Sequence, residues 1–135
     1  MVKGSCLCGE IKYEVELIPD KIYNCHCSQC RKSHGAAFAT QAFAKGETLR
    51  FIQGEDLIGE YKEKLGIRAF CTQCGSRLMN YTKDKNIYLS IALATLDEHF
   101  EDGPVAHAFV ASKAPWHHPS EDIPCYDELP AGAFE

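Results

Sequence analysis

Three cysteines, Cys25, Cys27 and Cys30, lie within a stretch of six residues. Thiols this close in sequence bind a metal ion, carry out redox chemistry or form disulfides. Three thiolates are one short of the four ligands of a closed tetrahedral zinc site, and catalytic zinc sites keep one position for water or substrate. The spacing therefore favours a zinc site with an open position, and such a sulfur-rich site is suited to binding another thiol.

Histidines leave other interpretations of this stretch open. His34 follows Cys30 by four residues, which allows it to be a fourth ligand in a closed structural site, or instead the general acid of a reaction at an open one. His26 lies between two of the cysteines, so we expect its side chain to point away from the metal. More distant candidates for the fourth ligand are His107, His117 and His118. A redox role without metal is the remaining alternative.

A second set of four cysteines comes from two distant parts of the chain: Cys6, Cys8, Cys71 and Cys74. Two pairs from two turns are typical of a closed structural zinc site. Gly75 directly follows the last of them, which suits a knuckle in which backbone N–H groups face the sulfurs. A redox dithiol at Cys71 and Cys74 is the alternative. Cys125 stands alone and is predicted to be an inert or surface thiol.

Three further residues are candidates for binding a substrate. Arg31 and Lys32 directly follow the last cysteine of the first set, where they could hold a carboxylate or simply be solvated charges. Trp116 is the single tryptophan. A lone tryptophan is most often a core residue, but proline and histidine neighbours in an irregular segment favour a position that lines a pocket.

The elements that position these residues are mostly short strands. Residues 11–17 alternate between apolar and charged side chains, which predicts a half-buried strand that Pro19 and Asp20 end. A short helix is expected over 27–34, ending at Gly35, and a helical turn over 97–100. Further strands are expected at 22–24, 37–43, 47–52, 57–61, 66–70, 77–81, 86–93 and 105–111. The pattern predicts a single, mostly β domain over residues 1–135, with two or more packed antiparallel sheets.

Composition excludes several classes of function. The chain has 135 residues, with 14 Lys and Arg against 19 Asp and Glu, for a net charge of −5. Without a basic block, nucleic-acid binding is disfavoured. The first residues lack the pattern of a signal peptide, and no apolar run approaches the ~18 residues that cross a bilayer. We therefore expect a soluble, cytoplasmic protein, in whose reducing surroundings eight cysteines serve metal binding or catalysis rather than disulfides.

The order of four motifs resembles the glutathione-dependent formaldehyde-activating enzyme family, which also contains the centromere protein V relatives. The similarity runs from about residue 3 to about residue 126. The four motifs are Gly4-Ser5-Cys6-Leu7-Cys8-Gly9, the stretch from Cys25 to Phe38, Phe70-Cys71-Thr72-Gln73-Cys74-Gly75 and Ser112-Lys113-Ala114-Pro115-Trp116.

The resemblance implies an Mss4-like (β-tent) zinc fold with two zinc ions. In the family, a structural zinc is held by cysteines that match Cys6, Cys8, Cys71 and Cys74, and a catalytic zinc by cysteines that match Cys25, Cys27 and Cys30. The implied activity is that of a carbon–sulfur lyase, which adds glutathione to formaldehyde as an S-hydroxymethylglutathione synthase does. We therefore expect a thiol such as glutathione and a small aldehyde as partners, and neither nucleic acid nor membrane. The alternative is a zinc-stapled binding module in which both metals are structural.

Overall fold

The computed structural model describes residues 1–133, which form ten strands, one α-helix and four short 3-10 turns. These residues form two compact units. The first unit contains residues 1–18 and 42–101, and the second contains 19–41 and the chain from 102 onward. The predicted mostly β fold with packed sheets is confirmed. A single domain over 1–135 stays a prediction, and residues 134 and 135 lie outside the described part.

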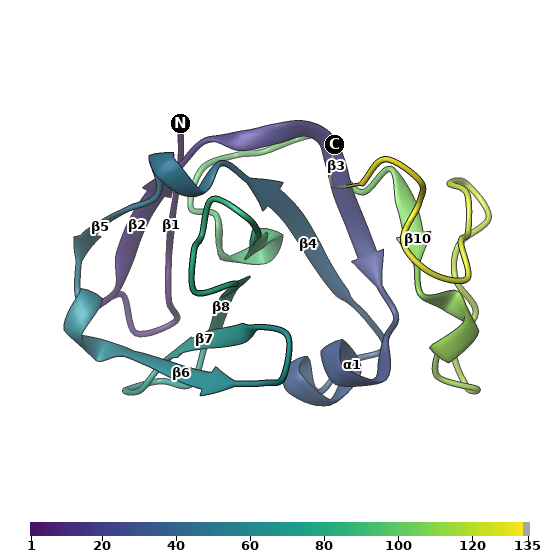
Figure 1. Cartoon of the computed structure of the whole chain (residues 1–135), viewed down its shortest axis with the longest axis horizontal. Coiled ribbons are helices and arrows are strands. Elements are labelled where there is room, and N and C mark those ends of the chain that lie inside the picture. Colours follow the sequence, from purple (N-terminus) through teal and green to yellow (C-terminus); the bar gives the residue numbers. More distant parts are fainter. Residues whose placement is uncertain (134–135) are drawn as a thin grey trace. The chain divides into compact units, whose positions relative to one another are not determined.

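A small antiparallel sheet opens the first unit. Its strand order is β1–β2–β5, so that β2 is central (Figure 1). The alternation predicted for residues 11–17 is present in β2, where Tyr13 and Val15 are buried and Lys12 is exposed. The bounds are Val2–Ser5 for β1, Lys12–Val15 for β2 and Arg50–Gln53 for β5.

Four further strands of the first unit pair in chain order as an antiparallel meander. The turn between its second and third strands, β7 and β8, carries Cys74, and Cys71 is the last residue of β7. The strands are β6 (Ile58–Lys62), β7 (Ile67–Cys71), β8 (Arg77–Tyr81) and β9 (Leu89–Ala92). This meander therefore places two cysteines at one tight turn.

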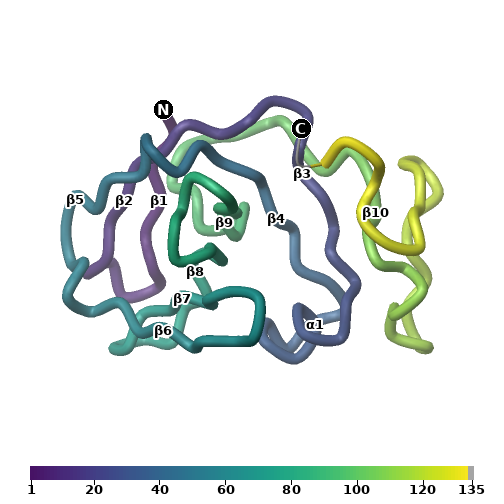
Figure 2. The backbone as a smooth tube through the Cα atoms, viewed as in Figure 1, coloured from purple at the N-terminus to yellow at the C-terminus, as the bar shows by residue number. Residues whose placement is uncertain are grey.

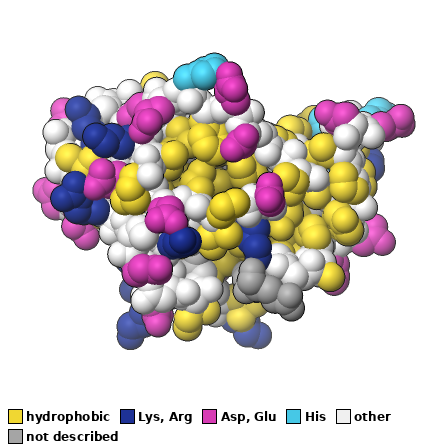
Figure 3. Space-filling view, turned by 90° about the horizontal axis from the view of Figure 1, so that it is seen from above, with side chains coloured by type: hydrophobic (Ala, Val, Ile, Leu, Met, Phe, Trp, Pro, Cys, Tyr) yellow, Lys and Arg dark blue, Asp and Glu magenta, His cyan; other side chains and the backbone are white. Residues whose placement is uncertain are grey.

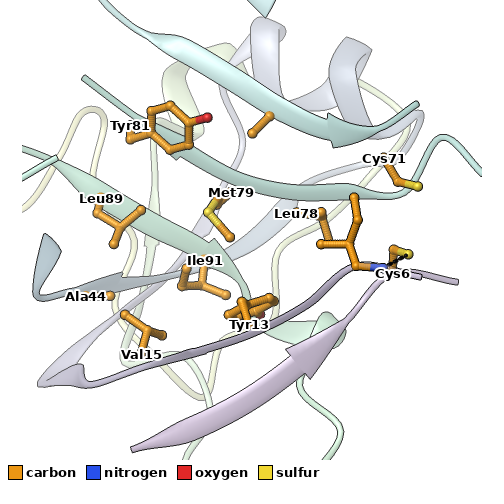
Figure 4. Packing of buried hydrophobic residues seen from close by; sticks show 12 residues of the cluster. Cys6, Tyr13, Val15, Ala44, Cys71, Leu78, Met79, Tyr81, Leu89 and Ile91 are labelled. Carbon is orange, nitrogen blue, oxygen red and sulfur yellow. Dashed lines mark hydrogen bonds between the residues drawn. The ribbon is translucent and has the colours of Figure 1, made fainter. Parts of the chain in front are cut away.

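The hydrophobic core of the first unit lies between the small sheet and the meander. Its fully buried side chains include Tyr13 from β2, Leu78 from β8 and Ile91 from β9. Burying a large apolar side chain stabilises a fold by about 1.5–3 kcal/mol. Figure 4 shows Cys6 and Cys71 at one end of this cluster, so the core itself brings together cysteines from distant parts of the sequence.

The second unit holds the helix α1 (Ser28–His34) and the strand β10 (Ala106–Ala108). Two strands continue from one unit into the other along the chain, β3 (Leu17–Cys25) and β4 (Ala39–Ala44). β10 runs parallel to the end of β3, with Ala108 opposite Cys25. The segment after Lys113 folds back beside β10 (Figure 2). Its backbone exchanges hydrogen bonds with His107, whose N–H donates to Pro124 O and whose O accepts from Tyr126 N.

Five local predictions are wrong. The strands expected at 47–52 and 105–111 are shortened to β5 and β10, because 3-10 turns occupy Gly46–Thr48 and Val110–Ser112. Pro19 and Asp20 lie inside β3 and do not end a strand. Extended backbone tolerates the φ of proline, and Asp20 adopts a left-handed conformation with φ of 61° while the strand continues past it. Both residues are exposed. Residues 97–100 form no helical turn, since the 3-10 turn comes earlier, at Leu93–Thr95. The strand expected at 86–93 is shortened to β9, where every residue is buried, and Ile87 is 72% exposed.

Two features of the described residues concern membrane spans and surface charge. Among residues 1–133, no helix combines the length and apolarity that a membrane span requires. On the face shown in Figure 3, acidic and basic side chains of the described residues lie interspersed, and no large basic region forms there.

Candidate metal centres

The four-thiol group consists of Cys6, Cys8, Cys71 and Cys74, and its sulfur atoms all lie within 4.8 Å of one another. The Sγ atoms of Cys6 and Cys8 are 3.5 Å apart, and those of Cys8 and Cys71 are 3.9 Å apart. In a tetrahedral site with Zn–S bonds of about 2.3 Å, sulfurs lie about 3.8 Å apart. All eight cysteines are free thiols. The arrangement therefore fits a metal ion such as zinc and not a pair of disulfides.

Hydrogen-bond donors lie close to three sulfurs of this group, those of Cys6, Cys71 and Cys74. The backbone N–H of Ile11 donates to Cys6 Sγ at 3.3 Å, and the N–H groups of Gln73 and Cys74 both donate to Cys71 Sγ at 3.4 Å. The hydroxyl of Ser76, 3.2 Å from Cys74 Sγ, and the Ser76 backbone lower the pKa of Cys74 to about 5. Donors of this kind stabilise the charged form of a ligand.

The three-thiol group consists of Cys25, Cys27 and Cys30, whose Sγ atoms also lie within 4.8 Å of one another. Cys25 ends β3, Cys27 is the N-cap of α1, and Cys30 is buried in the first turn of that helix. The Sγ atoms of Cys25 and Cys27 are 3.4 Å apart, and the N–H of Cys30 donates to Cys27 Sγ at 3.3 Å. A strand end and a helix start thus bring three sulfurs together.

The close approach of the three thiols makes their deprotonation unfavourable unless a cation is bound. The neighbouring thiols of Cys27 and Cys30, together with burial, raise the pKa of Cys25 far above its ordinary value. Three thiolates so close together repel one another, and a divalent metal ion removes that penalty. The soft sulfur donors fit zinc among the common metals.

No histidine, aspartate or glutamate of residues 1–133 joins the three sulfurs in the same group. His34 lies in the last turn of α1, half-buried, and stands outside the group. His26, His107, His117 and His118 are also outside it. The closed Cys₃His arrangement therefore finds no support among the described residues, and the catalytic role of His34 stays a prediction.

Two buried histidines, His26 and His107, lie beside the three-thiol group, and the sequence did not predict the contact between them. His26 is fully buried, and its Nε2 is 3.3 Å from Nδ1 of His107, which is 2% exposed. Burial, reinforced by the nearby His107 and His117, lowers the pKa of His26 to about 4, so its ring is neutral at neutral pH. The sequence held one indication that His107 is buried, because it stands between two alanines in a predicted strand. The structure buries all three residues of that strand.

An almost continuous series of rings connects His26 to an exposed tryptophan. His26 packs against Phe38 and His117 at centroid distances of 5.0 and 5.7 Å, and Phe38 lies 5.5 Å from His117. Trp116 contacts His117 edge-on at 6.3 Å and is 73% exposed. The tryptophan is therefore a surface residue of the second unit and no part of a core.

The remaining candidates occupy different environments. Arg31 and Lys32 lie in α1, where basic side chains in the last turn also interact favourably with the helix dipole. The Arg31 Nε is buried and has no hydrogen-bond partner, whereas Lys32 is exposed. Cys125 is exposed and belongs to neither thiol group of the described residues. This position agrees with the predicted surface thiol.

Comparisons with known proteins agree with this geometry. A family model described as glutathione-dependent formaldehyde-activating enzyme matches residues 1–112, a range that holds both thiol groups. The match ends at Ser112, the first residue of the last motif, so residues 113–126 of the expected similarity lie outside it. A crystal structure of a Rhodobacter sphaeroides protein is similar with a TM-score of 0.62 and 26% identity, covering 76% of this chain and 97% of that one. No curated protein matches the chain.

Proposed function

Because the chain belongs to the glutathione-dependent formaldehyde-activating enzyme family, we propose that it is a zinc-dependent carbon–sulfur lyase. It would add glutathione or a similar thiol to formaldehyde or a related small carbonyl. The observation that carries this proposal is the three-thiol group, in which three sulfurs converge and no further ligand of the described residues joins them. A set of three protein ligands is the arrangement that leaves a position for a substrate.

The proposed reaction needs no oxidant or reductant. The sulfur of the thiol forms a bond to the carbonyl carbon, and the electron pair of the C=O π bond moves to oxygen. The proton lost by the thiol balances the charge when oxygen takes up a proton, which gives a hydroxymethyl thioether. A bound zinc ion would supply a Lewis acid that lowers the pKa of the incoming thiol.

Cys25, Cys27 and Cys30 would hold the metal in this mechanism, and His34 is the proposed proton donor. Cys30 and His34 are four residues apart in α1 and therefore lie on the same face of the helix. This spacing supports His34 as the group that gives a proton to the developing oxyanion. The four-thiol group would hold a second, structural zinc.

Arg31, Lys32 and Trp116 are the proposed binding residues for glutathione, which carries two carboxylates. The unpaired, buried Nε–H of Arg31 is a donor that a carboxylate could accept from, and guanidinium groups bind carboxylates in fixed geometry. The exposed ring of Trp116, which lies at the end of the ring series from His26, offers an apolar contact for the rest of the peptide.

A matched pair of variants tests the proposal. Cys25→Ser removes one sulfur of the three-thiol group, and Cys125→Ser removes an exposed thiol outside both groups. We expect Cys25→Ser to lose one of two bound zinc ions and the formation of the thiol adduct, measured by metal analysis and by NMR with ¹³C-formaldehyde and glutathione. Cys125→Ser should keep both. Unchanged zinc content and turnover in Cys25→Ser would show that the assignment is wrong.

A second measurement separates the enzyme from a binding module. In the cobalt-substituted protein, glutathione should change the visible absorption of the three-thiol site, because a fourth sulfur enters the coordination sphere. Loss of this change in Cys25→Ser, with the absorption of the other site kept, would support the proposal. Two cobalt ions with spectra that glutathione does not alter would favour a zinc-stapled module in which both metals are structural.

A further inference from the structure

His26 is fixed to β10 at two points. Its backbone N–H donates to Ala108 O at 2.9 Å, and its Nε2 lies 3.3 Å from His107 Nδ1. Cys25 and Cys27 precede and follow it in extended backbone, where neighbouring side chains point to opposite sides. The two sulfurs therefore share one side, at 3.4 Å, while the imidazole of His26 occupies the other.

The hydrogen bonds around His107 assign a proton to each ring. The hydroxyl of Thr40 donates to Asn24 Oδ1 at 2.7 Å, so the Asn24 amide turns its Nδ2 donor toward His107 Nδ1 at 3.3 Å. His107 Nδ1 is therefore an acceptor, and its one lone pair is shared between Asn24 Nδ2–H and Nε2–H of His26. The other nitrogen of His107, Nε2, donates to Ser120 O at 3.0 Å, with Ser120 Oγ at the same distance.

Part of the support of this pair comes from outside the residues that the family model matches. Ser120 lies beyond the match, which ends at residue 112. So do Pro124 and Tyr126, whose backbones hydrogen-bond to the backbone of His107. His117, which stacks on His26, also belongs to this segment. The segment 113–133 thus reaches the three-thiol group through His107 and His26.

We propose that His26 is a positioning residue for the three-thiol group, and that His107 and the segment 113–133 hold it in place. The link fixes the turn from which Cys25 and Cys27 direct their sulfurs. Nδ1 of His26 is buried without a hydrogen-bond partner. Buried polar groups are normally paired, and a network of this kind in place of apolar packing fixes one orientation of its members. The proposal rests on the three-thiol group being a metal site.

Two variants of His107 in the full-length, cobalt-loaded protein test the positioning role. His107→Leu removes the acceptor for His26, and His107→Asn places an amide oxygen near the position of Nδ1. We expect His107→Leu to weaken cobalt binding at the three-thiol group by about 10–100-fold against a competing chelator and to shift its visible absorption. His107→Asn should restore both properties in large part. The four-thiol group is the internal reference and should not change.

A second pair of variants keeps the test decisive if His107→Leu does not fold. His26→Gln retains a donor near the position of Nε2, whereas His26→Asn is too short to reach His107. We expect the three-thiol group to bind cobalt more tightly in His26→Gln than in His26→Asn. Equal affinities and spectra in both would overturn it.

Metal binding at the three-thiol group and the positioning role of His26 can be tested separately. If the unaltered chain binds cobalt at the four-thiol group alone, both the proposed metal site and the positioning role are wrong. If cobalt fills both groups and the affinity and absorption of the three-thiol site are the same in His107→Leu as in the unaltered chain, the positioning role alone is wrong. Equal weakening of both sites by His107→Leu would also overturn it, because the effect would then be a general loss of stability.

Discussion

The two thiol groups are built in opposite ways. The four-thiol group joins turns that are far apart in the sequence, with 63 residues separating Cys8 from Cys71, and two of its members belong to the hydrophobic core of the first unit. The three-thiol group comes from a single stretch at the start of α1. A metal in the first group closes a long loop, whereas a metal in the second closes almost none.

Under the proposed function, this difference distinguishes a group that stabilises the fold from a group that binds the reacting thiol. Closing a long loop removes conformational freedom from the unfolded chain, so a metal there stabilises the fold. A metal at a local site removes little conformational freedom from the unfolded chain, so it adds little stability. The geometry of such a site depends on other residues that hold the ligands in place. The link from His26 to His107 supplies such support in the second unit. We therefore expect the two groups to respond differently to matched changes.

The largest effect should follow from Cys71→Ser. Cys71 is fully buried in the core and its sulfur accepts two backbone N–H groups. Structural zinc in small peptides is worth roughly 10–16 kcal/mol of apparent binding free energy, which is as large as the total stability of a typical domain, about 5–15 kcal/mol. We expect the variant to be unfolded at room temperature by circular dichroism. A cooperative thermal transition near that of Cys125→Ser would contradict the structural role.

Cys25→Ser should cost activity and leave the fold in place. Changes to residues that only support a metal ligand cost 10–100-fold, so loss of a ligand should lower the rate of adduct formation by more than about 100-fold. Because the site closes no long loop, the free energy of unfolding should fall by about 3 kcal/mol or less. Chemical denaturation of the zinc-loaded protein measures this. A loss of stability as large as in Cys71→Ser would remove the distinction between the groups.

The partition of the cysteines was predictable because it depends on spacing alone. Four thiols in two distant pairs and three in one stretch are visible in the sequence, and the structure brings together the same two sets. The alternation in β2 and the Gly35 end of α1 were visible for the same reason.

The support of the three-thiol group could not be predicted, since it depends on parallel pairing. His107 meets Asn24 and His26 only because β10 lies beside β3, and no local pattern encodes which strands become neighbours. Trp116 was ambiguous for a related reason, because the exposure of a residue in an irregular segment depends on what packs against it.

Gly4→Ala tests whether strain in the first unit affects the four-thiol group alone. Gly4 is paired with Tyr13, and a Cβ at this position would lie 2.4 Å from the tyrosine hydroxyl oxygen. The ring would have to move, and its hydrogen bond with Thr95 would be strained. We expect a loss of about 1–3 kcal/mol in the free energy of unfolding, measured by denaturation. Gly103→Ala is the control, because a Cβ there meets nothing within 4 Å.

Cobalt spectra of Gly4→Ala add a second criterion. Gly4 precedes Cys6 by two residues, so the strain should speed the release of metal from the four-thiol group to a chelator. The absorption of the three-thiol site should stay unchanged. Faster release from the three-thiol site alone would contradict this prediction.

The smallest effect is expected at Gly35, which ends α1 in the left-handed conformation with φ of 60°. A Cβ would meet no atom within 4 Å, so Gly35→Ala costs only the conformational penalty, about 1–2 kcal/mol. Gly35→Asn should cost less, because asparagine tolerates this conformation. Since α1 carries Cys30 and is capped by Cys27, metal release from the three-thiol group should accelerate in the order Gly, Asn, Ala, measured with a chelator. Because Gly35 belongs to the second unit, the four-thiol group should release its metal at one rate in all three proteins, and acceleration at that group would show that the two sites are not independently supported.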